Sequence, residues 1–402
     1  MSPLPPDITL MGTVAFRNRT DRFGIKVKDR LRHMFVVGQT GTGKTTLIQT
    51  MATDDMEKDR GVAVIDPHGD LVGKLVDVVP KRRRNDLLYF DATDVITPFA
   101  FNPLAERFGS TDGERSRLVS AIISAFQKTW PDFWGPRSEH LLRMGLLALT
   151  EFQGMTFLDL NRFIADKNWR EKLTAKVEDK VIRDFWLFEF ARMPARLQAE
   201  SLSPLQNKLG ALIGNPLLRG ILGQARSKLQ LTKMLREEKI LLVNLSRGLL
   251  GQDASVLLGS LMLSLVETAA LGRAEQKEEE RKPFFLYVDE FSFFATPSFI
   301  PMLAQGRKYG LGMTLAQQSL ASLPPWLQAD ILTNSGTLVC FRVGAADAKV
   351  MAEEMAPTYE AGDLMGLPLG EFVVRLIVEG YAKAAFSGRT RFLSVSVRSI
   401  LR

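Results

Sequence analysis

Short apolar runs of strand length recur along the chain and alternate with longer stretches that suit helices. Near the start, "FVV" (35–37), "GVAVID" (61–66) and "LLYFD" (87–91) have this character. It returns after residue 236 in "ILLVN", "FFLYV", "GMTLAQ", "TLVCF" and "FVVRLIV". Strands that are apolar on both faces and alternate with helices are typical of a parallel sheet covered by helices. The pattern therefore predicts an α/β fold with a doubly wound, mostly parallel sheet.

The pattern changes between about residues 110 and 236. Apolar residues there recur at helical spacing, prolines interrupt the runs, and no convincing strand stands out. We therefore expect an all-helical domain, residues 110–236, inserted into an α/β domain formed by residues 1–109 and 237–402. Two short runs before the first parallel strand, "LMGTVAF" and "FGIKVKD", predict a hairpin or an added edge on the sheet.

A glycine-rich turn and a lysine follow the first parallel strand. In "GQTGTGKTTL", Gly38, Gly43, Lys44 and Thr45 fit the spacing G-x-x-x-x-G-K-[ST]. In this motif backbone N–H groups at a helix N-terminus cradle phosphates, the lysine reaches the β- and γ-phosphates, and the hydroxyl ligates Mg²⁺. The alternative is an ordinary glycine turn with a solvated lysine. A chance match of this kind is rarer when a strand precedes the motif and a helix follows it. The α/β domain is therefore predicted to bind nucleotide.

Two adjacent acids follow the apolar run "FFLYV". In phosphate-loop enzymes such a strand presents its first acid, here Asp289, to Mg²⁺, and the second, Glu290, can act as general base toward water. A strand that ends in two surface acids is the alternative. A carboxylate beside the metal favours hydrolysis over passive binding. The residues leave the choice between ATP and GTP open, although the guanine-specific pattern N-K-x-D does not occur in the sequence.

The stretch "AQGRKYGLGMTLAQQSL" adds a basic pair, Arg307 and Lys308, before a strand that ends in glutamines. An arginine near a transferring phosphoryl group stabilises transition-state charge, and a glutamine at a strand end can sense the γ-phosphate or orient water. The residues alone equally allow a basic helix end, because cations suit the negative end of a helix dipole.

Composition limits the class of protein. A single cysteine, Cys340, excludes an internal disulfide framework, and three histidines make a His-rich metal site unexpected. The longest uncharged apolar stretch, residues 254–266, is too short to span a membrane and runs into Glu267. We expect a cytoplasmic chain without a transmembrane segment or signal peptide.

The charge distribution points to an anionic partner. The formal net charge is +7, and residues 111–236 hold 20 Lys or Arg against 13 Asp or Glu. This excess could bind DNA or an acidic protein, or it could be a solvated helical face. Four tryptophans lie in the same region and are expected in its core, with base stacking as the alternative: Trp130, Trp134, Trp169 and Trp186.

Taken together, "HMFVVGQTGTGKTTL", "IDPHGD", "FNPL", "LYVDEF", "GRKYGLGMTLAQQSL" and "FRVGAADA" resemble the HerA and FtsK superfamily of phosphate-loop motors. Within it the sequence is most similar to type IV secretion coupling proteins, the ATPases of conjugative DNA transfer. The helical insertion after "FNPL" sits where coupling proteins carry their all-alpha domain. Many coupling proteins begin with transmembrane helices, and none is expected in this chain.

The resemblance implies a RecA-like fold, a ring that is usually a hexamer, ATP and Mg²⁺ between neighbouring subunits, and single- or double-stranded DNA driven through the channel. It implies Asp289 as metal ligand, Glu290 as catalytic base, Gln317 as sensor with Gln318 as the alternative, and Arg307 reaching into the next subunit's site. The residues expected to bind phosphate and metal are Gly38, Thr40, Gly41, Thr42, Gly43, Lys44, Thr45 and Thr46.

Three further polar residues have open roles. Asp66 and His68 of "DPHGD" could touch the metal shell, or they could shape the turn after their strand. Arg342 in "FRVG" could contact phosphate or DNA, or form a buried ion pair.

The leading function is an ATP-driven DNA translocase that delivers DNA and attached protein to a conjugative or type IV secretion apparatus. Partners would be the secretion channel and a relaxase, and the chain would work in the cytoplasm, peripherally at the inner membrane. The alternatives are a HerA-like repair helicase or packaging ATPase, and an ATP-dependent assembly factor acting on proteins.

Overall fold

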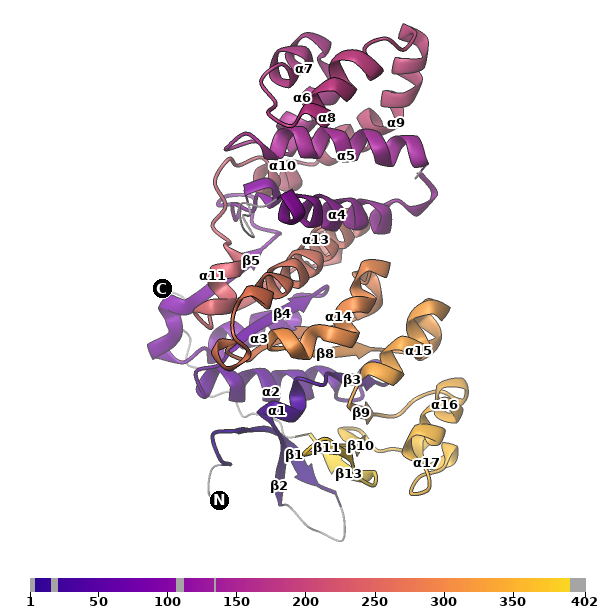
Figure 1. Ribbon diagram of the computed structural model, residues 1–402. Helices are drawn as coiled ribbons and strands as arrows, with labels where there is room; N and C mark the ends of the chain where they lie inside the picture. The colour runs from indigo at the N-terminus through magenta and orange to yellow at the C-terminus, as the bar shows by residue number, and fades with distance from the viewer. Residues whose placement is uncertain (1–3, 16–20, 106–111, 134, 391–402) are drawn as a thin grey trace.

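The computed structural model describes residues 4–15, 21–105, 112–133 and 135–390. Figure 1 shows a large sheet with helices on both faces and a stack of further helices at one end of the molecule. Helices α4 (Asp112–Thr129) and α13 (Gln252–Leu271) lie between the sheet and this stack. In the described part of the chain, residues 112–236 form helices and no strand. The exact division into domains stays a prediction.

Eleven strands of the described residues form one sheet, in the order β2-β1-β13-β10-β9-β3-β8-β7-β4-β6-β5. The strands from β9 to β5 run parallel, and the other four extend the sheet as antiparallel neighbours. This arrangement confirms the predicted fold class. The strand bounds are β1 (Ile8–Val14), β2 (Arg22–Lys26), β3 (Met34–Val37), β4 (Gly61–Asp66), β5 (Leu87–Asp91), β6 (Ile240–Asn244), β7 (Phe284–Val288), β8 (Leu311–Gln317), β9 (Thr337–Cys340), β10 (Glu371–Arg375), β11 (Ile377–Val378), β12 (Tyr381–Ala382) and β13 (Phe386–Arg389).

The helices divide between the sheet and the inserted segment. Those that follow strands are α1 (Val27–Arg30), α2 (Lys44–Glu57), α3 (Asp70–Val78), α12 (Arg247–Leu250), α13, α14 (Ile300–Gln305), α15 (Pro325–Asn334), α16 (Ala345–Met355) and α17 (Ala361–Met365). The inserted segment holds α4, α5 (Pro136–Thr150), α6 (Phe157–Ala165), α7 (Lys167–Thr174), α8 (Lys180–Asp184), α9 (Ala195–Gly214), α10 (Pro216–Leu222) and α11 (Leu231–Arg236).

Alternate residues of the parallel strands pack on opposite helix layers, because side chains of a strand point to alternating faces. Val36 and Val64 belong to the core beneath α2 and α3. Phe35 and Ile65 belong to the other core, which continues through α13 into the inserted helices. Both faces of these strands are therefore buried, which explains their unbroken apolar runs.

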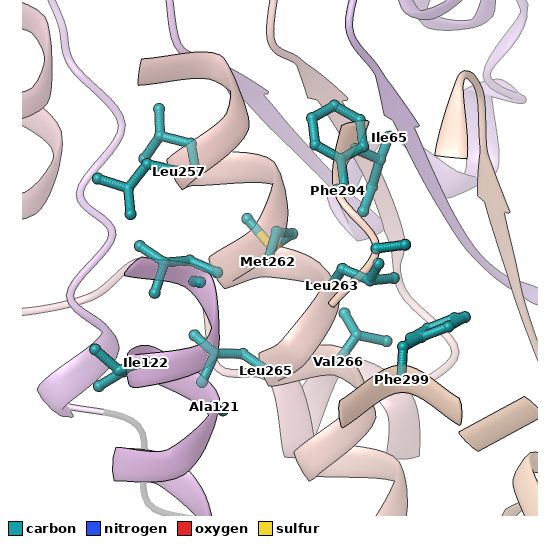
Figure 2. Close-up of a cluster of buried hydrophobic side chains, with 14 of the residues drawn as sticks. Ile65, Ala121, Ile122, Leu257, Met262, Leu263, Leu265, Val266, Phe294 and Phe299 are labelled. Carbon is teal, nitrogen blue, oxygen red and sulfur yellow. The ribbon is translucent and has the colours of Figure 1, made fainter. Parts of the chain in front are cut away.

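Helix α13 is apolar on every side because it lies between the sheet and α4. Figure 2 shows Leu265 of α13 beside Ala121 and Ile122 of α4. The opposite side of α13 meets the sheet and the chain after β7 at the side chains of Ile65, Phe294 and Phe299. A helix over residues 252–275 is long and apolar enough to cross a membrane, but 94% of its most apolar window is buried inside the protein. Its composition is that of a core helix.

Glu267 is a buried carboxyl on α13. It is 7% exposed, and no hydrogen bond or ion pair to it is found within the described residues. Burial raises the pKa of Glu267 to about 8. At neutral pH the folded protein therefore keeps a proton that the unfolded chain, with a pKa near 4.5, releases.

We expect the free energy of unfolding to fall as pH rises from about 4.5 to about 8, because only the unfolded state loses this proton there. Glu267→Gln removes this dependence, so the stability of the variant relative to wild type should grow by up to about 1.4 kcal/mol per pH unit. Denaturant unfolding across this range measures the difference. Glu279→Gln, at an exposed acid, is the control. Parallel stability curves for wild type and Glu267→Gln would contradict the expectation.

A buried charged cluster joins β1 of the N-terminal hairpin to helix α2 and strand β7. Arg30 donates to both carboxylate oxygens of Asp55 at 2.7 and 2.8 Å, and to the Tyr287 hydroxyl at 2.7 Å. Thr9 of β1 donates to Asp55 at 3.1 Å, and Arg60 donates to Asp55 at 2.7 Å. Each buried charge is thus paired, as burial requires.

Several predicted elements differ in detail. The run "FGIKVKD" is a strand only to Lys26 and then forms the short helix α1. The last predicted strand, β10, is antiparallel to β9, and β13 beside it was not predicted. Trp186 is 3% exposed, so the base-stacking alternative is wrong for it. Trp130 and Trp169 pack against the core, as expected, and Trp134 lies outside the described residues.

Candidate nucleotide site

The phosphate loop joins β3 to α2 at the carboxyl edge of the parallel strands. An added Cβ at Gly38 would lie 2.5 Å from the Cβ of Phe341. Gly43 has a φ of 126°, and its Cβ would lie 2.8 Å from the Phe341 ring. Both positions therefore require glycine. The N–H of Gly38 donates to the Gln317 carbonyl at the end of β8 at 3.2 Å, and that of Gln39 donates to the Arg342 carbonyl just after β9 at 2.9 Å, which fixes the loop to the sheet.

The start of α2 offers donors for an anion. The helix begins at Lys44 without a side-chain cap. The first N–H groups of a helix have no intrahelical acceptor, so those of Lys44, Thr45 and Thr46 remain available at its positive end. Thr40 and Gly41 are exposed at the mouth of the loop. The cradle therefore fits the phosphates of a nucleotide.

Thr42 differs from its neighbours in the loop. Its side chain is buried, and its hydroxyl donates to the Gln39 carbonyl at 2.7 Å. Its N–H donates to the same carbonyl at 3.3 Å. Both donors of Thr42 thus hold the loop in shape.

Lys44 lies against the loop that it follows. Its Nζ donates to the carbonyls of Gly38 at 2.5 Å and Gln39 at 3.2 Å, and the residue is 5% exposed. Burial lowers the pKa of Lys44, and the charges of Glu290 and Asp289 oppose this. The ammonium group therefore sits between the loop and the two acids, where it can neutralise phosphate charge.

The two predicted acids directly follow β7, at the same edge of the sheet. Asp289 and Glu290 are 6% and 5% exposed. Glu290 has a φ of 46°, in the left-handed region that non-glycine residues rarely adopt, and such strain is concentrated at functional sites. Its N–H donates to the Asp289 carboxylate at 3.1 Å. The chain thus turns sharply and keeps both carboxyls close to Lys44.

Burial, helped by the neighbouring charges of Glu290 and Asp66, raises the pKa of Asp289 to about 6, and the charge of Lys44 opposes this rise. This cluster of buried acids favours a cation. No group of three His, Cys, Asp or Glu side chains within the described residues could hold a metal by itself. Asp289 and the hydroxyl of Thr45 supply oxygen ligands of the kind Mg²⁺ uses, and phosphate and water oxygens can complete its shell.

Gln317 ends β8 beside these acids. Its side chain is 2% exposed, whereas that of Gln318 is exposed. Gln317 Nε2 donates to Ser322 Oγ at 2.7 Å and lies 3.5 Å from Glu290 Oε2. Its Oε1 accepts from the N–H of Ser292 at 3.0 Å. Of the two glutamines, Gln317 is the one in contact with the candidate base.

Arg307 lies far from the loop of its own chain. It belongs to the 3₁₀ turn η9 (Gly306–Tyr309), which precedes β8, whereas the loop contacts the other end of that strand. The seven residues of β8 span roughly 20 Å at 3.3 Å per residue. The Arg307 side chain is exposed, and no hydrogen bond or ion pair to it is found in the described part of the chain. Arg307 therefore does not contact the phosphate loop of its own chain.

Asp66 shapes the turn after β4, as one of its two interpretations predicted. It accepts from the N–H groups of His68, Leu71 and Val72 at 2.8, 2.9 and 3.1 Å, which satisfies the start of α3. His68 is exposed. Arg342 is also exposed, so the interpretation as a buried ion pair is wrong. Its carbonyl supports the phosphate loop through Gln39.

Some supporting residues were missed from the sequence. Phe341 and Gly370 press on the phosphate loop, and the N–H of Gly370 donates to the Thr42 carbonyl at 3.0 Å. Ser292 and Ser322 orient Gln317. These contacts become visible only in the three-dimensional arrangement. The one local signal is the place of Ser292 in "VDEFSF", two residues after the candidate base Glu290.

A family model described as the type IV secretion-system coupling protein DNA-binding domain matches residues 22–355. Among solved structures, the plasmid coupling protein TrwB in complex with ADP and Mg²⁺ is 16% identical, with a TM-score of 0.71, covering 99% of this chain and 98% of that chain. The unbound bacterial conjugative coupling protein TrwBdeltaN70 is 15% identical, with a TM-score of 0.70, covering 94% and 89%. VirB4 of Thermoanaerobacter pseudethanolicus is 13% identical, with a TM-score of 0.61, covering 96% of each chain. No curated protein sequence matches significantly.

Proposed function

We propose that this chain, which belongs to the family of the type IV secretion-system coupling protein DNA-binding domain, is an ATP-hydrolysing motor that moves DNA for conjugative or type IV secretion. One observation carries the hydrolytic part of the proposal. The phosphate loop, Asp289, Glu290 and Gln317 meet in one buried site at the carboxyl edge of the sheet.

The residues of this site divide the work of hydrolysis. The N–H groups at the start of α2 and Lys44 would bind the phosphates, and Thr45 and Asp289 would hold Mg²⁺. The ion would supply positive charge that stabilises the negative charge on the phosphate oxygens. Glu290 accepts a proton from the attacking water, and Gln317 holds the Glu290 carboxylate in place.

A ring of subunits would complete the site. Arg307 is exposed at the edge of the sheet opposite its own phosphate loop, which suits a residue that acts across a subunit interface. We propose a homo-hexamer in which each Arg307 stabilises transition-state charge in the neighbour's site. The solved TrwB structure with ADP and Mg²⁺ supports the choice of cofactors.

The proposed track is DNA, and the family description supports it. The excess of basic residues in the inserted helical segment supplies charge that could contact phosphates. We place the protein at the cytoplasmic face of the inner membrane, where the secretion channel and a relaxase would be its partners.

ATP turnover with and without single- and double-stranded DNA tests this function. We expect DNA to stimulate turnover at modest salt, and the stimulation to decline as salt rises, because phosphate contacts weaken with salt. Glu290→Gln serves as the blank. Turnover that is clear but indifferent to DNA, at concentrations that allow ring assembly, would instead favour an ATPase that organises protein partners.

A further inference from the structure

The end of α4 touches the turn that follows the candidate catalytic base. Lys128, in the last turn of α4, donates from its Nζ to the carbonyl of Ser292 at 2.8 Å. Ser292 lies in the 3₁₀ turn η7 (Phe291–Phe293), directly after Glu290. The hydrogen bond therefore joins the inserted helical segment to the nucleotide site across 164 residues of sequence.

The same serine also contacts Gln317. The Ser292 N–H donates to Gln317 Oε1 at 3.0 Å, and Gln317 Nε2 lies 3.5 Å from Glu290 Oε2. A movement of the Ser292 backbone therefore changes the position of Gln317 relative to Glu290. Glu290 directly precedes η7 and has a backbone φ of 46°, in the strained left-handed region.

Lys128 is an unusual choice for a purely structural contact. It is half-buried, and this burial lowers the pKa of its amine. Withdrawing an ammonium group from water costs free energy unless the group is hydrogen-bonded, and the Ser292 carbonyl is the acceptor that the structure provides. Nearby, Trp130 Nε1 donates to Asp253 of α13 at 3.0 Å, which holds the end of α4 against the α/β part.

We propose that Lys128 is a positioning residue, through which the inserted helical segment controls the placement of Gln317 and Glu290 and hence the rate of hydrolysis. The inference rests on the proposed function. A ligand that shifts α4 would lengthen or shorten the bond to Ser292, and the contacts of Ser292 would carry the change to the base. DNA bound to the helical segment is such a ligand.

Steady-state turnover of Lys128→Met tests this role. Methionine keeps the length of the side chain and removes its donor. We expect kcat to fall about tenfold, the size of effect expected from the loss of one hydrogen bond made by a charged group, while KM for ATP stays close to wild type. The ratio of turnover with DNA to turnover without DNA should fall to nearly one, so that DNA no longer stimulates the variant.

Two further variants separate positioning from folding. Lys172→Met removes an exposed lysine of α7 in the same segment and should match wild type. Lys128→Arg restores a donor and should recover much of kcat. An unchanged kcat in Lys128→Met would overturn the inference. So would a parallel loss of kcat, nucleotide binding and thermal stability, which indicates a structural role alone.

Amide hydrogen exchange gives a readout that does not depend on turnover. In Lys128→Met, exchange of residues 290–294 should be about fivefold faster than in wild type or Lys172→Met, because η7 loses its anchor. Equal exchange would overturn the inference and leave the proposed function standing. If wild type hydrolyses no ATP or ignores DNA, the proposed function fails, and exchange still decides whether Lys128 positions η7.

Discussion

Glu290→Gln is expected to reduce ATP turnover by about 10²- to 10³-fold and to leave binding of ATP with Mg²⁺ nearly unchanged. The amide has nearly the same shape as the carboxylate but cannot accept the proton of the attacking water. Glu290 does not belong to the phosphate cradle, so binding through Lys44 and the start of α2 should persist. Phosphate release and equilibrium binding of a fluorescent ATP analogue measure the two effects.

Glu279→Gln is the matched control, because it removes a carboxylate from an exposed position in a charged loop. It should leave both turnover and binding unaltered. If Glu290→Gln retained a tenth or more of wild-type turnover, Glu290 would not be the base, and the buried Asp289 would be the next candidate.

Arg307→Ala is expected to lower turnover by about 10³-fold, the range found for arginines that stabilise phosphoryl transfer. The residue stands at the opposite end of β8 from the loop of its own chain, so the loss must occur at a neighbour's site. Mixing Arg307→Ala with Glu290→Gln subunits should therefore restore activity. At some interfaces the Arg307→Ala subunit contributes an intact Glu290, and the Glu290→Gln subunit contributes an intact Arg307.

Lys308→Ala is the control for Arg307, because it removes the adjacent exposed charge. It should keep most of the activity. Mixed assemblies verified by mass spectrometry that show no recovered turnover would rule out an arginine acting across the interface.

Local patterns predicted much of the site. Gly38, Gly43 and Lys44 were recognisable because a phosphate loop needs fixed residue types at fixed spacing. The acids after β7 could be predicted because carboxyl ends of parallel strands meet at one edge. Choosing between Gln317 and Gln318 required the side-chain direction at the end of β8, which neighbouring strands determine.

Other features depend on contacts that no local pattern encodes. Strand β10 pairs antiparallel with β9 and β13. An apolar run predicts a strand but does not indicate whether that strand is parallel or antiparallel to its neighbours. Lys128 looks like an ordinary helix-end lysine until α4 is packed on α13 and its amine meets Ser292. The exposure of Arg342 likewise depends on tertiary packing.

Movement along DNA is the most direct test. We would measure ATP-dependent displacement of a third strand from duplex DNA, and of streptavidin from a biotinylated single strand. Wild-type protein with ATP is expected to displace one of these blocks, and Glu290→Gln is expected to displace neither. Clear ATP turnover by wild type without displacement of either block would contradict a DNA motor.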